Sequence, residues 1–300
     1  MELSGAVISE PTFQRVAIVG LGLIGGSWGL ALAKAGFAGQ RVGCDRREIL
    51  NRALRRQVVD EGDSDPAEAV RGSDLVILAT PVGTILDLLP KLKKACAYNT
   101  LVTDVGSTKR LICRRAHEFF GAEPLFLGGH PLAGKERCGL ENADAKLFEK
   151  CRYVLTPLLP AHQSDPRVQR FAALLGAMGA LPHWTDATSH DRAIAVLSHL
   201  PQLLSSSLAS LTEEQSAAGK LPLELAASGF RDVTRLADSP YSIWRDICLT
   251  NAENIQTALE ALIQKLESMK LHLSDRELEH EFQQAAHLRD RLRGIGSGRS

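Results

Sequence analysis

The sequence predicts an α/β N-terminal domain with a mostly parallel, doubly wound sheet, followed by an all-α C-terminal domain. Up to about residue 184, short apolar segments alternate with amphipathic helical patterns, as in a parallel sheet covered by helices on both faces. From about residue 187 the strand pattern ends and long helical periodicity replaces it. We expect domains at residues 1–186 and 187–292 and a disordered tail at residues 293–300.

The predicted sheet rests on short apolar segments separated by helical patterns, of which the last is the weakest. The predicted strands cover residues 15–20, 40–44, 74–79, 100–104, 124–128, 152–156 and 181–184. In an open parallel sheet, ligands bind outside the carboxyl ends of the strands. The residues that directly follow each strand are therefore the first candidates for a functional site.

A glycine-rich turn, Gly20-Leu-Gly-Leu-Ile-Gly25, follows the first predicted strand. Gly20 allows the tight turn, Gly22 leaves room for backbone to approach a pyrophosphate, and Gly25 lets the next helix lie close to the strand. The phosphates would meet unpaired N–H groups at the helix N-terminus. The residues expected to contact the dinucleotide here are Gly20, Gly22, Leu23, Ile24 and Gly25. The pattern predicts a Rossmann-type domain, although such glycines also occur in ordinary strand-to-helix turns.

An acidic residue, Asp45, follows the second predicted strand, about twenty residues after Gly25. A carboxylate there accepts hydrogen bonds from the adenosine ribose and repels a 2′-phosphate, which favours NAD over NADP. Arg46 beside it could instead meet a 2′-phosphate or stack on adenine. Thr80 and Pro81 follow the third predicted strand and are expected to line the nicotinamide side, with a simple proline turn as the alternative. The sequence therefore predicts NAD as the cofactor.

A histidine, His130, follows the fifth predicted strand and is flanked by glycines. These glycines let backbone pass close to a ligand. Oxidising an alcohol removes a hydride from carbon and a proton from oxygen, and a neutral imidazole can accept that proton. His130 is therefore the candidate catalytic base. Ser107, a small polar residue after the fourth predicted strand, is a second candidate, with a helix N-cap as its alternative role.

The predicted helical domain carries a long apolar face. Apolar residues recur at helical spacing at Ile194, Leu197, Leu200, Leu204, Leu208 and Leu211. Such a face must be buried by other helices, within the chain or in a second chain. Pro201 is expected to kink this helix beside His199.

Two arginines in the same domain, Arg231 and Arg235, lie four residues apart with Asp232 between them. The acid could orient one guanidinium that binds a carboxylate, with a surface salt bridge as the alternative.

Composition limits the possible partners. Positively and negatively charged residues number 35 each, so no overall field attracts nucleic acid or an anionic membrane. The chain shows no long uninterrupted apolar run and no export signal. The six cysteines form no C-x-x-C pair, and the histidines show no metal-binding spacing. We expect a cytoplasmic protein that binds a small molecule and no metal, nucleic acid or membrane.

Taken together in this order, several motifs resemble the prephenate dehydrogenase family of tyrosine biosynthesis, which includes arogenate dehydrogenase. The motifs are Gly20-Leu-Gly-Leu-Ile-Gly25-Gly-Ser27, Ala79-Thr-Pro81, Asp104-Val-Gly-Ser107-Thr-Lys109, Gly129-His130-Pro-Leu-Ala-Gly134, His190-Asp191, Ser198-His199-Leu-Pro201, Gly229-Phe-Arg-Asp232-Val-Thr-Arg235 and Ile243-Trp244-Arg-Asp246. The first is shared by many dehydrogenases, whereas the later motifs are more specific.

The resemblance implies oxidative decarboxylation of prephenate to 4-hydroxyphenylpyruvate with reduction of NAD. It implies His130 as the base for the C4 hydroxyl and Ser107 as its hydrogen-bonding neighbour. The implied substrate-binding residues are His199, Asp232, Arg235 and Trp244. Arg235 would bind a substrate carboxylate with Asp232 as support, and Trp244 would close the pocket. The resemblance also implies a homodimer formed through the helical domain.

Three alternatives remain open at this point. Prephenate and arogenate differ by a keto group and an amine, and the motifs do not choose between them. Another two-domain NAD(P)-dependent hydroxy-acid dehydrogenase or imine reductase would share the architecture, but it would place a catalytic lysine on a helix of the second domain. An NAD-sensing regulatory module would not need His130, Ser107 and Arg235 together, and it would usually carry a basic DNA-binding helix.

Overall fold

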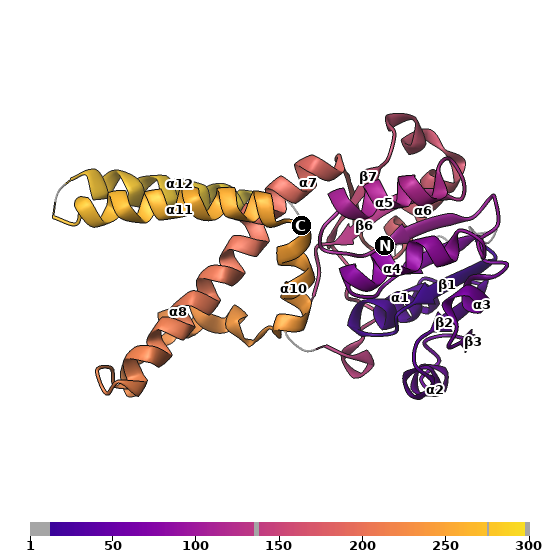
Figure 1. Ribbon diagram of the computed structural model, residues 1–300, viewed down its shortest axis with the longest axis horizontal. Coiled ribbons are helices and arrows are strands. Elements are labelled where there is room, and N and C mark those ends of the chain that lie inside the picture. The colour runs from indigo at the N-terminus through magenta and orange to yellow at the C-terminus, as the bar shows by residue number, and fades with distance from the viewer. Residues whose placement is uncertain (1–12, 135–137, 275, 298–300) are drawn as a thin grey trace, which may run out of the picture. The chain divides into compact units, whose positions relative to one another are not determined.

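The computed structural model describes residues 13–134, 138–274 and 276–297. Its contacts divide the chain into two compact units, one up to Ala252 and one from Glu253 onward. Figure 1 shows a sheet with helices and a further group of helices in the first unit, and a helical hairpin in the second. This division falls later than residue 187, so the predicted domain boundary stays a prediction.

An eight-stranded sheet forms the centre of the first unit. Its strands are β1 (Arg15–Val19), β2 (Gln40–Cys44), β3 (Glu61–Asp63), β4 (Leu75–Leu78), β5 (Leu101–Asp104), β6 (Leu125–Pro131), β7 (Arg152–Pro157) and β8 (Leu181–Trp184). The spatial order is β3-β2-β1-β4-β5-β6-β7-β8. Only the β6–β7 pair is antiparallel, so the predicted mostly parallel sheet is confirmed.

Two strands differ from the prediction. Strand β3 was not predicted, because its three residues are exposed and carry no apolar pattern. Strand β6 was expected to end at residue 128 but continues through Pro131. Its pairing with β5 stops at Leu127, whereas antiparallel β7 continues the ladder and pairs Val154 with His130. His130 therefore lies inside the end of a strand and not after it.

Helices cover both faces of the sheet. They are α1 (Leu23–Lys34), α2 (Arg47–Arg55), α3 (Pro66–Val70), α4 (Val82–Leu92), α5 (Arg110–Phe120) and α6 (Pro166–Ala177). Side chains alternate across a strand, so Val16 and Ile18 of β1 pack in one core with Trp28 of α1. Val19 packs in the other core with Ile85 of α4. These two cores confirm the doubly wound arrangement.

The rest of the first unit is helical. Its elements are α7 (Ala187–Ile194), a π-helical segment (Ala195–His199), α8 (Leu200–Ala217), α9 (Ser228–Thr234), a 3₁₀ segment (Arg235–Asp238) and α10 (Tyr241–Thr250). The π-helical segment ends two residues before Pro201, where the sequence predicted a kink. Proline has no N–H to donate to Leu197, and π segments are frequent at functional sites.

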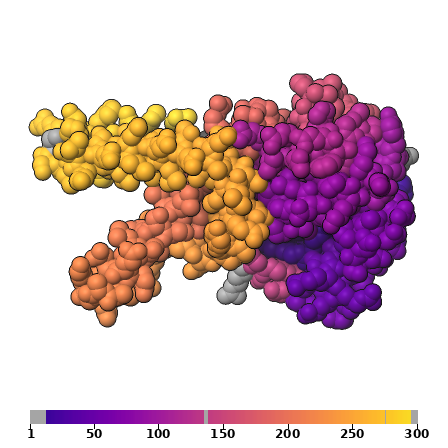
Figure 2. Space-filling view, in the orientation of Figure 1, coloured from indigo at the N-terminus to yellow at the C-terminus, as the bar shows by residue number. Residues whose placement is uncertain are grey.

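The long helix α8 has an unusual distribution of polar and apolar residues. Gln202 and Ser205 are its buried residues. Leu197 of the preceding π-helical segment and Leu204 and Leu211 of α8, spaced seven residues apart, are 75%, 39% and 54% exposed. Figures 1 and 2 show that α8 extends away from the sheet. These leucines form an exposed apolar stripe on one side of the helix.

The same run of helix, Ala187–Ala217, has the length and hydropathy that would allow it to cross a membrane. Apolar core helices of soluble proteins satisfy the same criteria, so this finding is weak evidence for a membrane span.

The second unit consists mainly of α11 (Ala252–Leu271) and α12 (Glu277–Ser297). The Lys265 ammonium lies 2.6 Å from a Glu281 carboxylate oxygen and joins the two helices. Helix α12 extends to Ser297 and so enters the segment from residue 293 for which disorder was expected. Once a helix is formed, each added residue gains a hydrogen bond, so the chain can extend it through Gly294. The last three residues of the predicted tail lie outside the described residues.

Candidate active site

The glycine-rich turn between β1 and α1 has the geometry of a phosphate-binding turn. Gly20 has a φ of +96°, and a Cβ atom there would lie 2.6 Å from the carbonyl oxygen of Ala79. A Cβ atom on Gly25 would collide with the carbonyl oxygen of Gly20. By contrast, a Cβ atom on Gly22 would have no neighbour within 4 Å, so space remains beside the turn. Helix α1 begins at Leu23 without a side-chain cap, which leaves its N–H groups for a ligand.

Asp45 lies directly after β2 and is held against this turn. Its Oδ2 accepts a hydrogen bond from the Leu21 N–H at 2.8 Å, and its Oδ1 accepts one from the Arg46 N–H at 2.7 Å. A carboxylate has about four lone-pair positions, so two remain for ribose hydroxyls. The residues of the turn and Asp45 therefore fit a dinucleotide.

At the end of β4, Thr80 and Pro81 lead into α4. The Thr80 hydroxyl is buried and has no hydrogen-bond partner in the part of the chain that the structure describes. A buried polar atom without a partner calls for an explanation, and a bound ligand would supply one. Pro81 directly precedes α4, whose Gly83 N–H donates to the Asp246 carboxylate at 2.8 Å.

A buried ion pair supports the carboxyl ends of β5 and β6. Lys109 and Asp104 are both fully buried and paired with each other. The Lys109 Nζ also donates to the Gly129 carbonyl at 2.7 Å. Asp104 in turn accepts from the Gly129 N–H at 3.1 Å and the Gly106 N–H at 2.8 Å. This ion pair fixes the backbone immediately before His130.

His130 is partly exposed at the end of β6, and its ring contacts another histidine. Its Nδ1 lies 2.9 Å from Nε2 of His190, and the two rings meet edge to face with centroids 5.1 Å apart. Partial burial of the ring, followed by the nearby His190, Lys109 and His199, lowers the pKa of His130 well below its ordinary value. The imidazole is therefore neutral at pH 7 and able to accept a proton.

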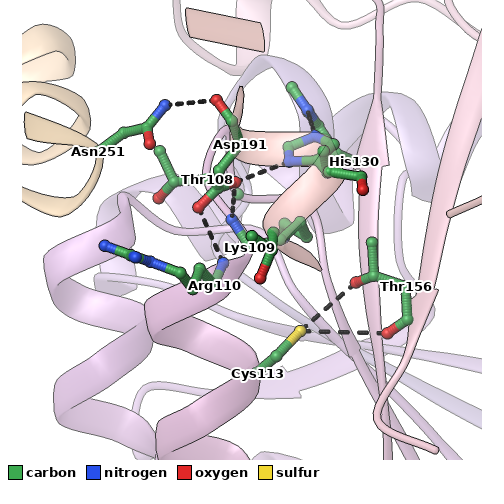
Figure 3. Close-up of polar contacts among 12 residues, drawn as sticks. Thr108, Lys109, Arg110, Cys113, His130, Thr156, Asp191 and Asn251 are labelled. Atoms are coloured by element: carbon green, nitrogen blue, oxygen red, sulfur yellow. Dashed lines mark hydrogen bonds and ion pairs between the residues drawn. The ribbon is translucent and has the colours of Figure 1, made fainter. Parts of the chain in front are cut away.

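Ser107 lies in the turn between β5 and α5 and is partly exposed. No hydrogen bond joins Ser107 to His130 within the described residues. Nor is Ser107 the N-cap of α5. The Asp191 carboxylate performs that role by accepting from the N–H groups of Lys109 at 2.7 Å and Arg110 at 2.9 Å, as Figure 3 shows.

His199 and Trp244 lie together beside this network. Their rings meet edge to face with centroids 5.8 Å apart. The Asn251 side-chain amide donates to the Asp191 carbonyl at 2.8 Å and lies 3.2 Å from Nδ1 of His199. Burial lowers the pKa of His199 to about 4. Its buried Nε2 has no partner among the described residues, so this polar atom can meet a ligand.

Arg235 and Asp232 are exposed side chains, on the 3₁₀ segment and on α9. The buried Gln202 of α8 donates to the Leu236 carbonyl at 2.8 Å and so holds the segment that begins with Arg235. The carboxylate-binding role of Arg235 stays a prediction.

Several residues that build this site had no role predicted from the sequence. They are Asp104, Lys109, His190, Asp191 and Asn251. The adjacent pair His190-Asp191 was visible as a motif, and a carboxylate directly after a histidine was a usable signal. Its contacts with Lys109 and His130 join α7 to the start of α5 and the end of β6, and they could not be read from local spacing.

The fold and the site define a class of protein. A glycine-rich turn with an acid after β2, combined with a neutral histidine at the carboxyl edge of the sheet, is typical of a nucleotide-dependent dehydrogenase. The helical part beyond the sheet supplies further side chains to the site.

Comparison with known proteins identifies the family. Domain models described as "Prephenate dehydrogenase, nucleotide-binding domain" and "Prephenate dehydrogenase, dimerization domain" match residues 28–181 and 186–288. A prephenate dehydrogenase of Lactococcus lactis subsp. cremoris is 33% identical over 93% of this chain and 77% of its own length. The chain belongs to the prephenate dehydrogenase family.

Solved structures agree with this assignment. The structure of an A. aeolicus prephenate dehydrogenase in complex with hydroxyphenyl propionate and NAD+ is 30% identical, with a TM-score of 0.84 over 94% of this chain and 98% of that one. The Synechocystis arogenate dehydrogenase is also 30% identical, with a TM-score of 0.78 over 93% of this chain and 99% of that one.

Proposed function

We propose that this protein is an NAD-dependent dehydrogenase that oxidatively decarboxylates prephenate to 4-hydroxyphenylpyruvate. Family membership supports the reaction. The single observation that carries the mechanism is the position of His130 at the carboxyl edge of the sheet that bears the glycine-rich turn. We infer a cytoplasmic location, which the six free thiols support.

The chemistry needs a proton acceptor and correct alignment. Bound NAD supplies the acceptor for the hydride that leaves C4 of the ring. His130 takes the proton of the C4 hydroxyl as this C–H bond breaks. The bond between C1 and the carboxylate then breaks, its electron pair makes the ring aromatic, and carbon dioxide leaves. The proton returns to the phenol oxygen, so the protein mainly aligns the ring and moves one proton.

The substrate contacts follow from the same arrangement. We propose that Ser107 hydrogen bonds the C4 hydroxyl beside His130 when substrate is present. His199, whose Nε2 is buried without a partner in the described part of the chain, and Trp244 would line the ring. Arg235 would bind a substrate carboxylate with Asp232 as support.

We further propose that the enzyme is a homodimer whose interface covers α8. The exposed stripe of Leu197, Leu204 and Leu211 carries the apolar surface that an interface requires, while polar residues face the chain's own interior. This also explains the high hydropathy of Ala187–Ala217 without a membrane.

The first prediction concerns the base. His130→Asn should lower kcat by about 100-fold or more, because asparagine cannot accept the proton, while the Kd for NAD stays near that of the wild type. The wild-type kcat should fall on the acid side only below pH 6.5, since the pKa of His130 is lowered and the ring must be neutral. Absorbance of NADH, measured with prephenate and with arogenate, gives these values. An unchanged kcat in the variant would remove His130 from the mechanism, and turnover with arogenate alone would correct the substrate.

The second prediction concerns the contact between Arg235 and a substrate carboxylate. Arg235→Gln should raise the KM for the substrate by about tenfold or more and leave the Kd for NAD unchanged, because one charge-assisted contact is lost. Arg231→Gln is the matched control, since Arg231 is also exposed and lies four residues earlier. Equal increases in both variants would argue against a specific carboxylate contact at Arg235.

The third prediction concerns cofactor choice. Asp45→Ser should raise the ratio of kcat/KM for NADP to that for NAD by about tenfold or more, because a negative charge beside the 2′-phosphate is removed. Glu48→Gln removes an exposed charge nearby on α2 and should leave the ratio unchanged. If the ratio stays fixed in Asp45→Ser, another residue selects the cofactor.

The fourth prediction concerns assembly. Leu204→Glu should convert the dimer to a monomer at micromolar concentration, because a charge would have to be buried at the interface. Sedimentation velocity measures this change. Leu159→Glu alters an exposed leucine away from α8 and should leave the dimer intact. A Leu204→Glu protein that remains dimeric would place the interface elsewhere.

A further inference from the structure

A pair of buried residues on α7, His190 and Asp191, contacts the proposed base and has no assigned role. We propose that this pair positions His130 by fixing its ring in the tautomer that leaves Nε2 unprotonated. The inference rests on the proposed function, in which His130 accepts the proton. The pair acts on the tautomer of the His130 ring. Neither residue of the pair contacts the substrate in this proposal.

The first step is the anchoring of Asp191. Its Oδ1 accepts from the Lys109 N–H at 2.7 Å and its Oδ2 accepts from the Arg110 N–H at 2.9 Å. Both donors lie at the N-terminus of α5, where the helix dipole favours a negative charge. The side chain is fully buried, so water does not compete for these contacts. The carboxylate is thereby fixed in one place, as Figure 3 shows.

The second step is the tautomer of His190. Its Nδ1 lies 2.7 Å from Oδ1 of Asp191, and the ring is buried. A carboxylate can only accept, so Nδ1 must carry a hydrogen. A neutral imidazole carries a single N–H, which leaves Nε2 of His190 as an acceptor. Asp191 already accepts from two backbone N–H groups, which compensate its negative charge without an imidazolium beside it.

The third step is the tautomer of His130. Its Nδ1 lies 2.9 Å from Nε2 of His190, which is an acceptor, so His130 must donate from Nδ1. The lone pair of the neutral ring is then on Nε2, the nitrogen that His190 does not contact. Without this arrangement both tautomers of His130 would be populated, and one of them offers the substrate hydroxyl an N–H in place of a lone pair.

The pair also explains why the base needs the helical part of the chain. His130 lies in the segment matched by the nucleotide-binding domain model, whereas His190 and Asp191 lie in the segment matched by the dimerization domain model. The Asn251 amide connects the Asp191 carbonyl with His199, which is a proposed substrate contact. The orientation of the base is therefore coupled to the docking of α7 and to the substrate pocket.

A purely structural role is the competing explanation, since Asp191 also caps α5. Asp246 provides a matched control. It is a buried aspartate that caps α4 through the Gly83 N–H at 2.8 Å and contacts no histidine within the described residues.

The groups whose charges act on the His130 ring are His190 from α7, Lys109 from the turn before α5 and His199 before α8. Measuring kcat at about pH 8 keeps the ring neutral, so that a shifted titration does not cause the effect.

The first part of the test uses substitutions of His190 in the full-length enzyme. His190→Leu removes the acceptor and should lower kcat by about 100-fold, with the KM and the Kd for NAD changed less than about threefold. His190→Gln can present its amide oxygen to Nδ1 of His130 and should recover kcat to within about tenfold of the wild type. Equal kcat in the wild type and His190→Leu, or equal losses in the leucine and glutamine variants, would overturn the proposal.

The second part tests the connection to Asp191. Asp191→Ala should lower kcat by about tenfold or more beyond Asp246→Ala, because both variants remove a carboxylate that caps a helix start but only the first removes the acceptor for Nδ1 of His190. In the His190→Gln background the difference in kcat between the Asp191 and Asp246 variants should vanish, because a glutamine amide has no second tautomer for Asp191 to exclude. If the loss of kcat in the double variant equals the product of the two single losses, Asp191 has a structural role and the proposal is overturned. If His130→Asn is itself fully active, the proposed base is wrong. If it is inactive while the kcat of Asp191→Ala matches that of Asp246→Ala, the positioning role alone fails.

Discussion

The buried ion pair between Asp104 and Lys109 is the interaction on which the site depends. Both side chains are fully buried, so each charge requires the other and the backbone groups around it. Lys109 donates to the Gly129 carbonyl, and Asp104 accepts from the Gly129 N–H, so both polar groups of the residue before His130 are bound to this pair. Removing one partner of a buried pair costs about 3–5 kcal/mol in other proteins. The interaction that positions the base therefore also contributes to the stability of the fold.

The helical elements complete this site through carboxylates directed at helix N-termini. Asp191 of α7 accepts from the first N–H groups of α5, and Asp246 of α10 accepts from α4. Both α4 and α5 begin at the carboxyl edge of the sheet, where ligands bind in this fold. Each contact satisfies N–H groups that a helix leaves unpaired. The same contacts that stabilise these helix starts therefore also align the two parts of the site.

Helix α8 links the site to assembly. Its buried residues, Gln202 and Ser205, are polar, and Gln202 holds the segment that begins with Arg235. Its apolar stripe is exposed in the single chain. A partner that covers this stripe would also restrain α8 and the π-helical segment that contains His199. Dimer formation and substrate binding would then act on the same helix.

The sequence by itself determined the features that depend on local chemistry. Apolar segments gave seven of the eight strands, and the glycines with Asp45 gave the dinucleotide turn, because these patterns express burial and backbone freedom residue by residue. It did not reveal the polar edge strand β3 or the extension of β6 to Pro131, which depends on antiparallel pairing with β7. Nor did it show that Asp191 caps a helix start 81 residues earlier or that His190 contacts His130 across 60 residues. Only the tertiary structure decided these contacts, because the partners of a buried polar group are chosen by proximity in space and not by spacing along the chain.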